Sequence, residues 1–283
     1  MTPSDFIWQA AFILAFGAAG AGMCRAVAAG QADRHFPAQL RRARHLYLVF
    51  PLLVGLPFTN VYVATHPSLQ WNMPDWLQLH WAALSWGIVS AALAYVFGFC
   101  STVAWTSDKR GRRLPALFSV GVLLAIQFYA AWCSRPNLPE LGEPWVSNDG
   151  VILQTSAFTC VPASGANIAA MLGVHTSEKE LAALFRTTRD GTFPAAALRG
   201  LRQLGIAGEK VSADNGDIHA VHPPAMLFVL SDTHAVVYAG SSGNLVELWN
   251  PSANPSAGKG YITEERLRHI WVGHALEFRR AGE

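Results

Sequence analysis

The stretch that decides the fold of the second half of the chain is Gln154-Thr-Ser-Ala-Phe-Thr-Cys160, which continues as Val-Pro-Ala-Ser-Gly-Ala-Asn-Ile-Ala-Ala-Met-Leu172. From Cys160 onward the apolar residues recur at helical spacing, and Gly173 follows as a helix-ending residue. Pro162 falls in the first turn, where proline is tolerated. The free amides and the positive end of a helix favour a thiolate at its start. The sequence therefore predicts a nucleophilic cysteine at position 160.

The base and its orienting partner are predicted in a hairpin further along the chain. His234 opens the strand-like run His-Ala-Val-Val-Tyr, and Asn250 ends the run after the turn at 240–243. A three-residue loop would place Asn250 directly opposite His234, whereas a two-residue loop would place Trp249 nearer that position. The pair therefore requires the longer loop or a bulge. The histidine would then take the thiol proton, and the asparagine would hold the imidazole in one tautomer.

Other residues compete for these roles. Asp232 is an alternative orienting group, but two residues before the histidine it points along the same strand face and has poor reach. His219 and His222 are alternative metal ligands, although no third ligand stands at a suitable spacing. Cys160 itself could be a buried small apolar side chain. We expect no metal and no cofactor. Other histidines of this half could replace the predicted base: His175, His219, His222, His269 and His274.

Around these residues the pattern changes from helical to strand-like. Ser177-x-x-Glu180 is a capping box that opens a second helix. Thr192 with Pro194 opens a third helix, which ends at Gly205. Helices first and antiparallel strands second predict an α+β domain. The later elements are predicted as strands at 225–230, 234–239 and 244–249, a helix at 263–270 and a final strand at 274–278.

The order and spacing of these motifs resemble the papain-like cysteine peptidases that process double-glycine bacteriocin leaders. In that family a glutamine stands six residues before the cysteine, a histidine opens a strand as HxVV, and an aspartate precedes a proline. The matching positions here are Gln154, His234-Ala-Val-Val and Asn250-Pro251, and the ending Trp271-Val-Gly-His-Ala-Leu-Glu-Phe is also similar. The resemblance covers about residues 150–280. It implies a papain-like fold in which Gln154 donates its side-chain amide to the oxyanion, beside the amide of Cys160.

The sequence departs from that family at three points. Val161 follows the cysteine where the family has glycine, and Asn250 stands where the family has aspartate. In the family the peptidase domain precedes a transporter and works inside the cell, whereas this chain has no Walker motif GxxxxGK[ST]. The resemblance thus implies a fold and a catalytic apparatus rather than the leader substrate.

Residues 1–133 differ in composition from the rest. They hold nine Lys/Arg and four Asp/Glu, against twelve and fifteen from Ser134 onward. Four apolar stretches are about 19–25 residues long, and a helix needs roughly 20 to cross the hydrocarbon core. The first could be a signal peptide, but it lacks a basic n-region, so we expect a retained span. Buried helices of a soluble core are the alternative. We predict four transmembrane helices, at residues 6–29, 46–64, 81–105 and 114–132.

Orientation follows from the loops between these stretches. Lys and Arg lie in the first and third loops, whereas the second, residues 66–80, has none and contains Asp75. Basic loops stay in the cytoplasm, so both termini and the second half of the chain are predicted to be external. Trp71 and Trp76 would then belong to an aromatic belt at the outer interface. Periplasm and Gram-positive exterior both stay open.

Residues 134–149 contain three prolines and are predicted to form an extended tether between a membrane region, 1–133, and a papain-like domain, 150–283. We predict a membrane-anchored cysteine peptidase that hydrolyses a peptide or amide bond outside the cytoplasmic membrane. Its expected partners are a peptide or protein near the membrane surface, the lipid bilayer and a further membrane protein. Nucleic acid is not expected, because the second half has no basic stripe. The alternatives are an acyl or peptidyl transferase acting on a lipoprotein or envelope polymer, and an inactive peptidase-like module that binds a membrane partner.

Overall fold

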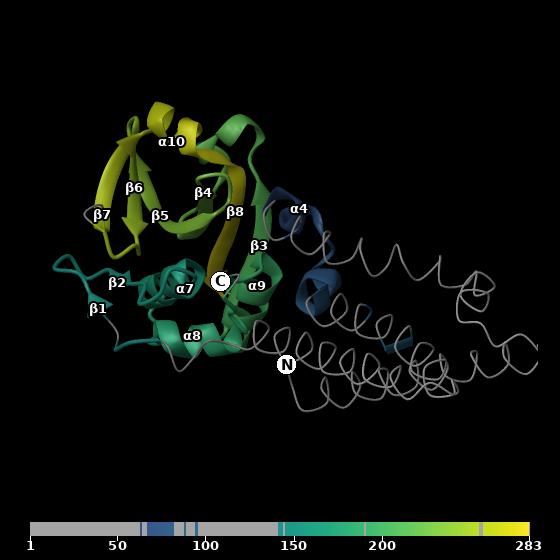
Figure 1. Ribbon diagram of the computed structural model, residues 1–283. Coiled ribbons are helices and arrows are strands. Elements are labelled where there is room, and N and C mark those ends of the chain that lie inside the picture. The colour runs from purple at the N-terminus through teal and green to yellow at the C-terminus, as the bar shows by residue number, and fades with distance from the viewer. Residues whose placement is uncertain are drawn as a thin grey trace, which may run out of the picture. The chain divides into compact units, whose positions relative to one another are not determined.

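The computed structural model describes residues 63, 67–81, 88, 94–95, 141–143, 145–189, 191–254 and 257–282 (Figure 1). By its internal contacts the chain divides into two compact units, Met1–Tyr62 with His80–Ser134, and Val63–Leu79 with Arg135–Glu283. The four predicted transmembrane stretches lie outside the described residues, apart from isolated positions. Among the helices that are described, none is both long enough and apolar enough to cross a membrane.

Three helices form the first part of the second unit: α7 (Cys160–Met171), α8 (Glu178–Leu184) and α9 (Pro194–Gln203). The predicted capping box opens α8, because the Ser177 hydroxyl accepts the Glu180 amide and the Glu180 carboxylate accepts the Ser177 amide. Pro194 occupies the first turn of α9, where its missing N–H needs no partner. All three predicted helices are therefore confirmed.

An antiparallel six-stranded sheet follows, with strand order β3-β8-β4-β5-β6-β7 (Figure 1). Helix α10 (Glu264–Ile270) connects the last two strands in sequence, and two short 3-10 helices, η3 (Asp214–Gly216) and η4 (Ile218–Ala220), follow the first. The predicted α+β class is confirmed for this part of the chain, although the first and fifth strands were not predicted. The strands are β3 (Ile206–Ser212), β4 (Ala225–Val229), β5 (His234–Ser242), β6 (Leu245–Asn250), β7 (Gly258–Thr263) and β8 (Trp271–Arg280).

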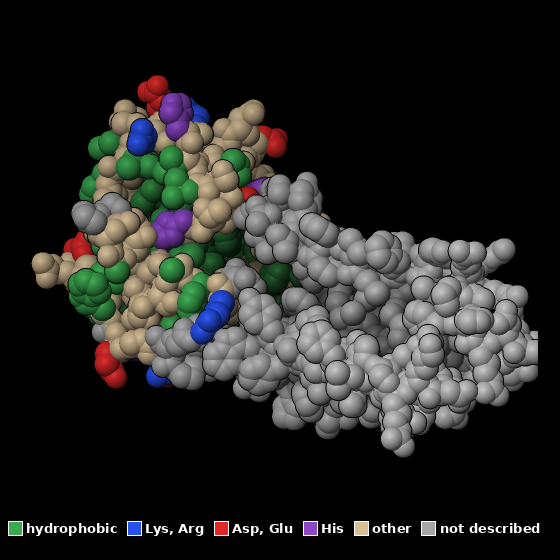
Figure 2. Space-filling model, viewed as in Figure 1, with side chains coloured by type: hydrophobic (Ala, Val, Ile, Leu, Met, Phe, Trp, Pro, Cys, Tyr) green, Lys and Arg blue, Asp and Glu red, His purple; other side chains and the backbone are tan. Residues whose placement is uncertain are grey.

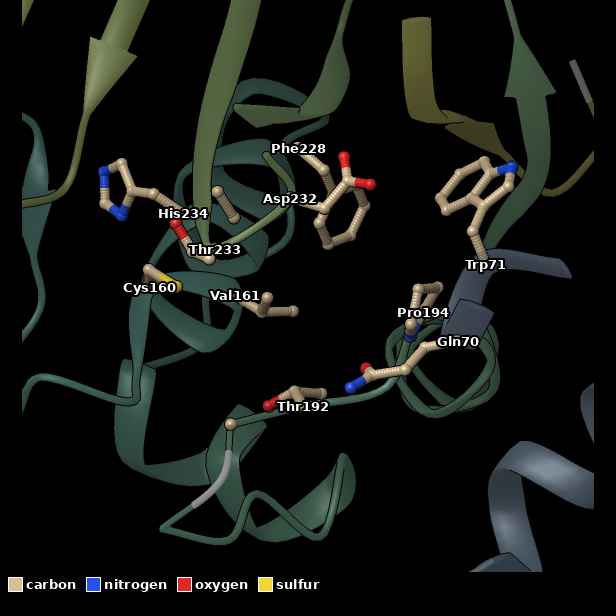
Figure 3. A pocket seen from close by; sticks show the side chains of 12 residues that line it. Gln70, Trp71, Cys160, Val161, Thr192, Pro194, Phe228, Asp232, Thr233 and His234 are labelled. Carbon is tan, nitrogen blue, oxygen red and sulfur yellow. The ribbon is translucent and has the colours of Figure 1, made fainter. Parts of the chain in front are cut away.

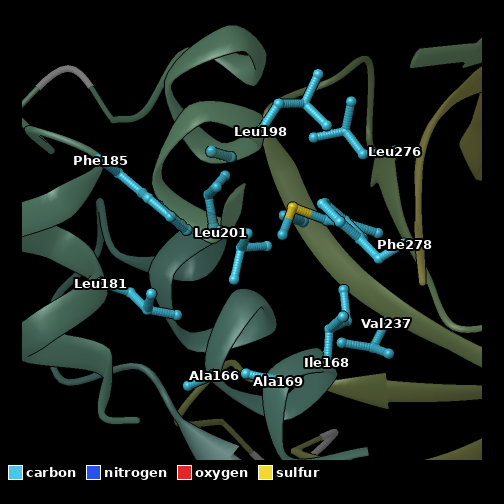
Figure 4. Close-up of a cluster of buried hydrophobic side chains, with 14 of the residues drawn as sticks. Ala166, Ile168, Ala169, Leu181, Phe185, Leu198, Leu201, Val237, Leu276 and Phe278 are labelled. Atoms are coloured by element: carbon cyan, nitrogen blue, oxygen red, sulfur yellow. The ribbon is translucent and has the colours of Figure 1, made fainter. Parts of the chain in front are cut away.

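Two hydrophobic clusters cover the two faces of this sheet. Strand β4 is buried along its whole length, so its apolar run is continuous rather than alternating. Met226 and Phe228 belong to the cluster that packs against α7, α8 and α9. Figure 4 shows Ile168 of α7, Leu181 of α8 and Leu201 of α9 in the same cluster. Leu227 and Val229 point into the opposite cluster, which α10 and β6 help to close. Burial of both faces fixes the register of the strands, because a one-residue slip would exchange the two sets.

Phe185, which follows α8, is the side chain around which the helices pack. It is fully buried, and its ring lies against Gly165 of α7 and Gly200 of α9. A Cβ at Gly200 would stand 2.3 Å from this ring, and one at Gly165 would stand 3.2 Å from it. The small residues therefore allow α7 and α9 to approach α8 closely, and this packing fixes the start of α7.

The predicted tether is partly wrong. Residues 134–140 lie outside the described ones, but β1 (Trp145–Val146) pairs with β2 (Ile152–Leu153) in an antiparallel ribbon. The Asp149 carboxylate in the intervening turn accepts the Ser147 hydroxyl and the Lys259 amide. The three prolines of this stretch all lie outside the described residues, so the observed pairing concerns only its last five residues. The packed domain therefore begins before residue 150.

The segment Val63–Leu79 packs onto the same unit, although the sequence separates it widely from the domain. Trp71, at the end of α4 (Pro67–Asn72), is 7% exposed and donates its Nε1–H to the Ser212 hydroxyl at 2.9 Å. Gln78 is 2% exposed, and its side-chain oxygen accepts the amide of Ala195 at 3.1 Å. Trp71 was expected at a membrane interface, and its stacking and hydrogen bond place it against the sheet instead.

Candidate active site

Cys160 is the first residue of α7, as predicted, and hydrogen bonds from later residues of the helix attach it to two strands, β5 and β2. The Ser164 hydroxyl donates to the carbonyl of Ala235 on β5 at 3.1 Å. The Asn167 amide makes two bonds to the backbone of Ile152 on β2, both 2.8 Å long. These buried polar side chains hold the helix start against the sheet, so the thiol has a fixed position.

His234 opens β5 and Asn250 ends β6, and the structure brings them together. The distance between His234 Nε2 and Asn250 Oδ1 is 2.9 Å. Ser252 provides a second partner, because its hydroxyl lies 3.1 Å from the same Nε2 and its amide donates to Asn250 Oδ1. Since the amide oxygen can only accept, it favours the tautomer that carries the proton on Nε2.

The geometry that joins the pair differs from the direct opposition expected. The hairpin has a two-residue loop, since Ser242 pairs with Leu245. A register shift between Tyr238 and Gly240 then inserts one extra residue into β5. Val237 pairs with Trp249, so Asn250 reaches the imidazole diagonally instead of from the facing position. The bulge, which was one of the two predicted requirements, is therefore present.

Burial controls the protonation of the cysteine and the histidine. It raises the pKa of the Cys160 thiol, while the backbone amides of Ala235, Val161 and Cys160 itself act in the opposite direction. Burial also lowers the pKa of His234, and the Asn250 hydrogen bond raises it. Both groups are thus stabilised in their neutral forms. The backbone amides at the helix start lower the pKa of the Cys160 thiol, as expected, but desolvation raises it by more.

Gln154, the predicted oxyanion donor, lies in the loop before α7. Its backbone amide donates to the Pro251 carbonyl at 2.7 Å, which ties this loop to the residue after Asn250. Its side-chain nitrogen donates to the Ser156 carbonyl at 3.0 Å, and its side-chain oxygen is buried with no partner among the described residues. The NH₂ group keeps a second N–H beyond the one bonded to Ser156, and the oxyanion role of Gln154 stays a prediction.

A pocket of about 180 Å³ is lined by two of the predicted site residues, Cys160 and His234, whereas Gln154 and Asn250 are not among the residues that line it (Figure 3). Cys160 and His234 form one end of it, and Trp71 and Gln70 of α4 form the other. Within the described part of the chain no hydrogen bond joins the thiol to the imidazole, as is common for a catalytic pair without substrate. The remaining lining comes from the ends of the helices and strands: Val161, Gly191, Thr192, Pro194, Phe228, Asp232, Thr233 and Ala235.

The sequence did not predict the far end of this pocket. Asp232, considered there as an alternative orienting group, instead has its carboxylate 2.7 Å from His274 Nδ1. The ring of His274 stacks on Trp71, with centroids 4.6 Å apart and planes 14° from parallel. Of the other candidate histidines, His219 pairs with Glu264 and His222 with Glu277, away from the pocket.

The face of the unit that Figure 2 shows has acidic and basic side chains of both signs scattered around its periphery. Hydrophobic side chains occupy its middle. This face therefore presents mixed charge around an apolar centre.

The chain was compared with known proteins. Residues 148–283 match the model of the Peptidase C39 family. An uncharacterized protein of Methanothermobacter marburgensis is 25% identical over 136 residues, which cover 48% of this chain and 92% of that protein. An uncharacterized protein of Methanothermobacter thermautotrophicus is 26% identical over 137 residues, again 48% of this chain and 92% of that one.

Solved structures are similar over the same region. One is a double glycine motif protease from an AMS/PCAT transporter in complex with the leader peptide, 21% identical, with a TM-score of 0.43 over 48% of this chain and 96% of that chain. Another is the peptidase domain of Streptococcus ComA, described as a bi-functional ABC transporter of a quorum-sensing pathway. It is 25% identical, with a TM-score of 0.41 over 45% of this chain and 96% of that one.

Proposed function

We propose, from the premise that residues 148–283 are a papain-like cysteine peptidase domain of the Peptidase C39 family, that Cys160, His234 and Asn250 act together to hydrolyse a peptide bond. The observation that carries this proposal is the 2.9 Å contact between His234 Nε2 and Asn250 Oδ1, beside a pocket that His234 lines together with Cys160 at a helix start. This arrangement supplies a nucleophile, a base and an orienting group.

The order of proton transfers follows from the tautomer. Because Nε2 carries the proton shared with Asn250, Nδ1 is the nitrogen that accepts the thiol proton. As the proton moves to His234, the Cys160 sulfur attacks the carbonyl carbon and the carbonyl electrons move to oxygen. Collapse of this intermediate breaks the C–N bond, and His234 Nδ1 delivers the proton to the leaving amine.

The second half of the reaction returns the enzyme to its starting state. His234 takes a proton from water, whose oxygen attacks the thioester carbonyl. When the C–S bond breaks, the carboxylic acid leaves and the sulfur of Cys160 recovers its proton. We assign stabilisation of the oxyanion in both attacks to the amides at the start of α7 and to the second N–H of Gln154, which the Ser156 bond leaves unused.

The test uses the full chain, a mixture of peptides of known sequence and mass spectrometry of the new termini. Wild-type protein should produce cleaved peptides, and the Cys160→Ala protein should produce none. Iodoacetamide should alkylate Cys160 of the wild-type protein, and the protein modified at Cys160 should be inactive. Cleavage that persists in Cys160→Ala would refute the proposal. An adduct to an added amine, formed in preference to hydrolysis, would make the protein a transferase instead.

The cellular location is a separate part of this proposal. The support is the sequence of residues 1–133, in which four apolar stretches are separated by loops of unequal basic charge. We propose that these stretches attach the chain to the cytoplasmic membrane with the peptidase domain outside. A reporter enzyme that works only outside the cytoplasmic membrane, fused after residue 283, should then be active. A cytoplasmic signal would reverse the orientation.

A further inference from the structure

The pocket extends well beyond the groups that the proposed hydrolysis uses. Figure 3 shows Cys160 and His234 at one end, Phe228 and Asp232 along one wall, and Trp71 at the other end. A substrate whose carbonyl carbon is at the thiol therefore places a neighbouring group in the remaining space. The chemistry of the far end decides which neighbouring group fits there.

Asp232 is the acidic residue among those that line the pocket. Its side chain is 6% exposed, and one carboxylate oxygen, Oδ2, lies 2.7 Å from His274 Nδ1. The other oxygen, Oδ1, is buried and has no hydrogen-bond partner among the described residues. A buried carboxylate oxygen without a donor is costly, and native proteins rarely retain one without a function.

The backbone before β5 explains why the Asp232 side chain points toward His274 of β8 at the side of the pocket. Leu230, Ser231 and Asp232 have φ values of 54°, 58° and 64°, so three successive residues adopt the left-handed conformation. Thr233 closes this turn, because its hydroxyl donates to the Leu230 carbonyl at 2.7 Å. An extended strand would have sent the aspartate along the face used by His234, whereas the turn sends it toward β8. Such an unfavourable run of conformations at a site is a mark of function.

The opposite wall is held as firmly as the aspartate. Trp71 is fixed by its stacking on His274, by an edge contact with Phe228 at 5.6 Å and by its bond to Ser212. Lys210 lies 5.9 Å above the Trp71 ring and forms an ion pair with Asp75. This lysine is thus already paired with an acidic side chain. The segment Val63–Leu79 closes the pocket with an aromatic wall rather than with a cation.

We propose that this far end is a subsite for a protonated amine or a guanidinium carried by the peptide substrate, with the carboxylate of Asp232 as its counter-charge. Among the described lining residues Asp232 is the single acidic group, and no lysine or arginine lines the pocket. The buried carboxylate would attract a cation in the pocket, and the faces of Trp71 and Phe228 would cover the alkyl stem. The inference rests on the proposed function, because it assigns a substrate to the same site.

Two sources of that cation are distinguishable, namely a lysine or arginine side chain and the amino terminus of the peptide. The probes are short peptidyl chloromethyl ketones, which alkylate the nucleophilic thiol. One series carries lysine at each of the three positions before the ketone, with norleucine as the neutral control of equal length. A second series compares a free amino terminus with an acetylated one. Iodoacetamide, which is too small to reach the far end, reports the reactivity of Cys160 alone.

The full chain should react with one of the cationic probes at least about tenfold faster than with its neutral partner, as expected for one pair of opposite charges held out of bulk water. Asp232→Asn should abolish that preference while the rate with iodoacetamide stays within about twofold of wild type, since no bond to the reactive thiol is lost. Gln70→Lys, which adds a cation across the pocket without altering the aspartate, should also remove the preference. This second variant keeps the test valid if Asp232→Asn does not fold.

Each outcome distinguishes the two proposals. Equal rates for cationic and neutral probes in wild type would overturn the subsite while leaving the nucleophile in place. A preference that survives in both Asp232→Asn and Gln70→Lys would also overturn it. If iodoacetamide does not alkylate Cys160, or if His234→Ala alkylates equally fast with every probe, the proposed catalytic function is the one that fails.

Discussion

Two histidine pairs adjoin one pocket, one through His234 and the other through Asp232, and they differ in the group that each histidine meets. His234 meets the neutral amide of Asn250, whereas His274 meets the carboxylate of Asp232. The first pair adjoins the thiol of Cys160 at the start of α7. The second pair adjoins the indole of Trp71, which has no nucleophilic atom. Both contain a fixed imidazole, so the imidazole alone does not define an active site.

The difference shows how the surroundings assign a role to each pair. A neutral partner keeps His234 able to gain a proton and lose it again during a reaction. The Asp232 carboxylate and the stacked indole of Trp71 hold His274 in one position. One oxygen of Asp232, Oδ1, has no hydrogen-bond donor among the described residues. We therefore propose proton transfer for the first pair and substrate binding for the second. Four changes test this division.

Loss of the first imidazole should have the largest effect. We expect His234→Ala to lower kcat for peptide hydrolysis by about 10²–10⁴-fold, the usual contribution of a general base. His274→Ala should act mainly on KM, because it only positions Asp232. His269→Ala, which removes an exposed histidine of α10, is the matched control and should leave both constants unchanged. A kcat loss in His274→Ala as large as in His234→Ala would end the division of roles.

Removal of the Trp71 indole, which stacks on His274 of the second pair, should lower the stability of the folded domain. Trp71→Ala deletes a buried indole and its bond to Ser212, so the free energy of unfolding should fall by about 3 kcal/mol. Trp76, five residues later and 62% exposed, provides the control, because Trp76→Ala should change stability by less than about 0.5 kcal/mol. The urea concentration at which Cys160 becomes fully reactive to a thiol reagent measures both. Equal shifts would mean that Val63–Leu79 does not support the domain.

The first pair could be predicted from sequence because its signals are local. A cysteine at a helix start, a proline in the first turn and a histidine opening a β-branched run are each readable within a few residues. The partner Asn250 was also found, but through a direct opposition that the hairpin does not have. A bulge at one residue replaces the longer loop, and sequence patterns rarely distinguish these two solutions.

The second pair could not be predicted in the same way. Asp232 and His274 are 42 residues apart, and Trp71 is more distant still. Their contacts depend on the neighbouring positions of β4 and β8 and on the packing of α4, which no local pattern encodes. The aspartate was rejected as an orienting group because an extended strand was assumed. The left-handed turn at 230–232 invalidates that assumption and directs the side chain elsewhere.

Weakening of the first pair at Asn250 should have a smaller effect than loss of His234. Asn250→Ala removes the bond that fixes the tautomer, so kcat should fall by about 10–100-fold, near the lower end of the contribution of a general base. Because that bond raises the pKa of His234, its loss should also shift the acidic limb of the kcat profile to lower pH. Asn250→Asp should restore most of kcat and shift the same limb to higher pH, because a carboxylate stabilises the imidazolium. Identical limbs in the three proteins would show that Asn250 does not control the base.

The pH dependence of stability gives the smallest effect. Burial lowers the pKa of His234 in the folded protein, so between the folded and unfolded pKa values the unfolded chain binds more protons. The contribution of His234 to stability is therefore complete above the unfolded pKa, near 6.5 for histidine, and is lost as the pH falls below it. Its slope cannot exceed about 1.4 kcal/mol per pH unit for one proton. The difference in unfolding free energy between wild type and His234→Gln isolates this term from the other histidines. A difference that stays constant from pH 7.5 to 5 would mean that burial does not shift the pKa of His234. A difference that grows toward acid would mean that the folded protein holds the His234 proton more tightly than the unfolded chain, which contradicts a buried neutral imidazole as the base of the first pair.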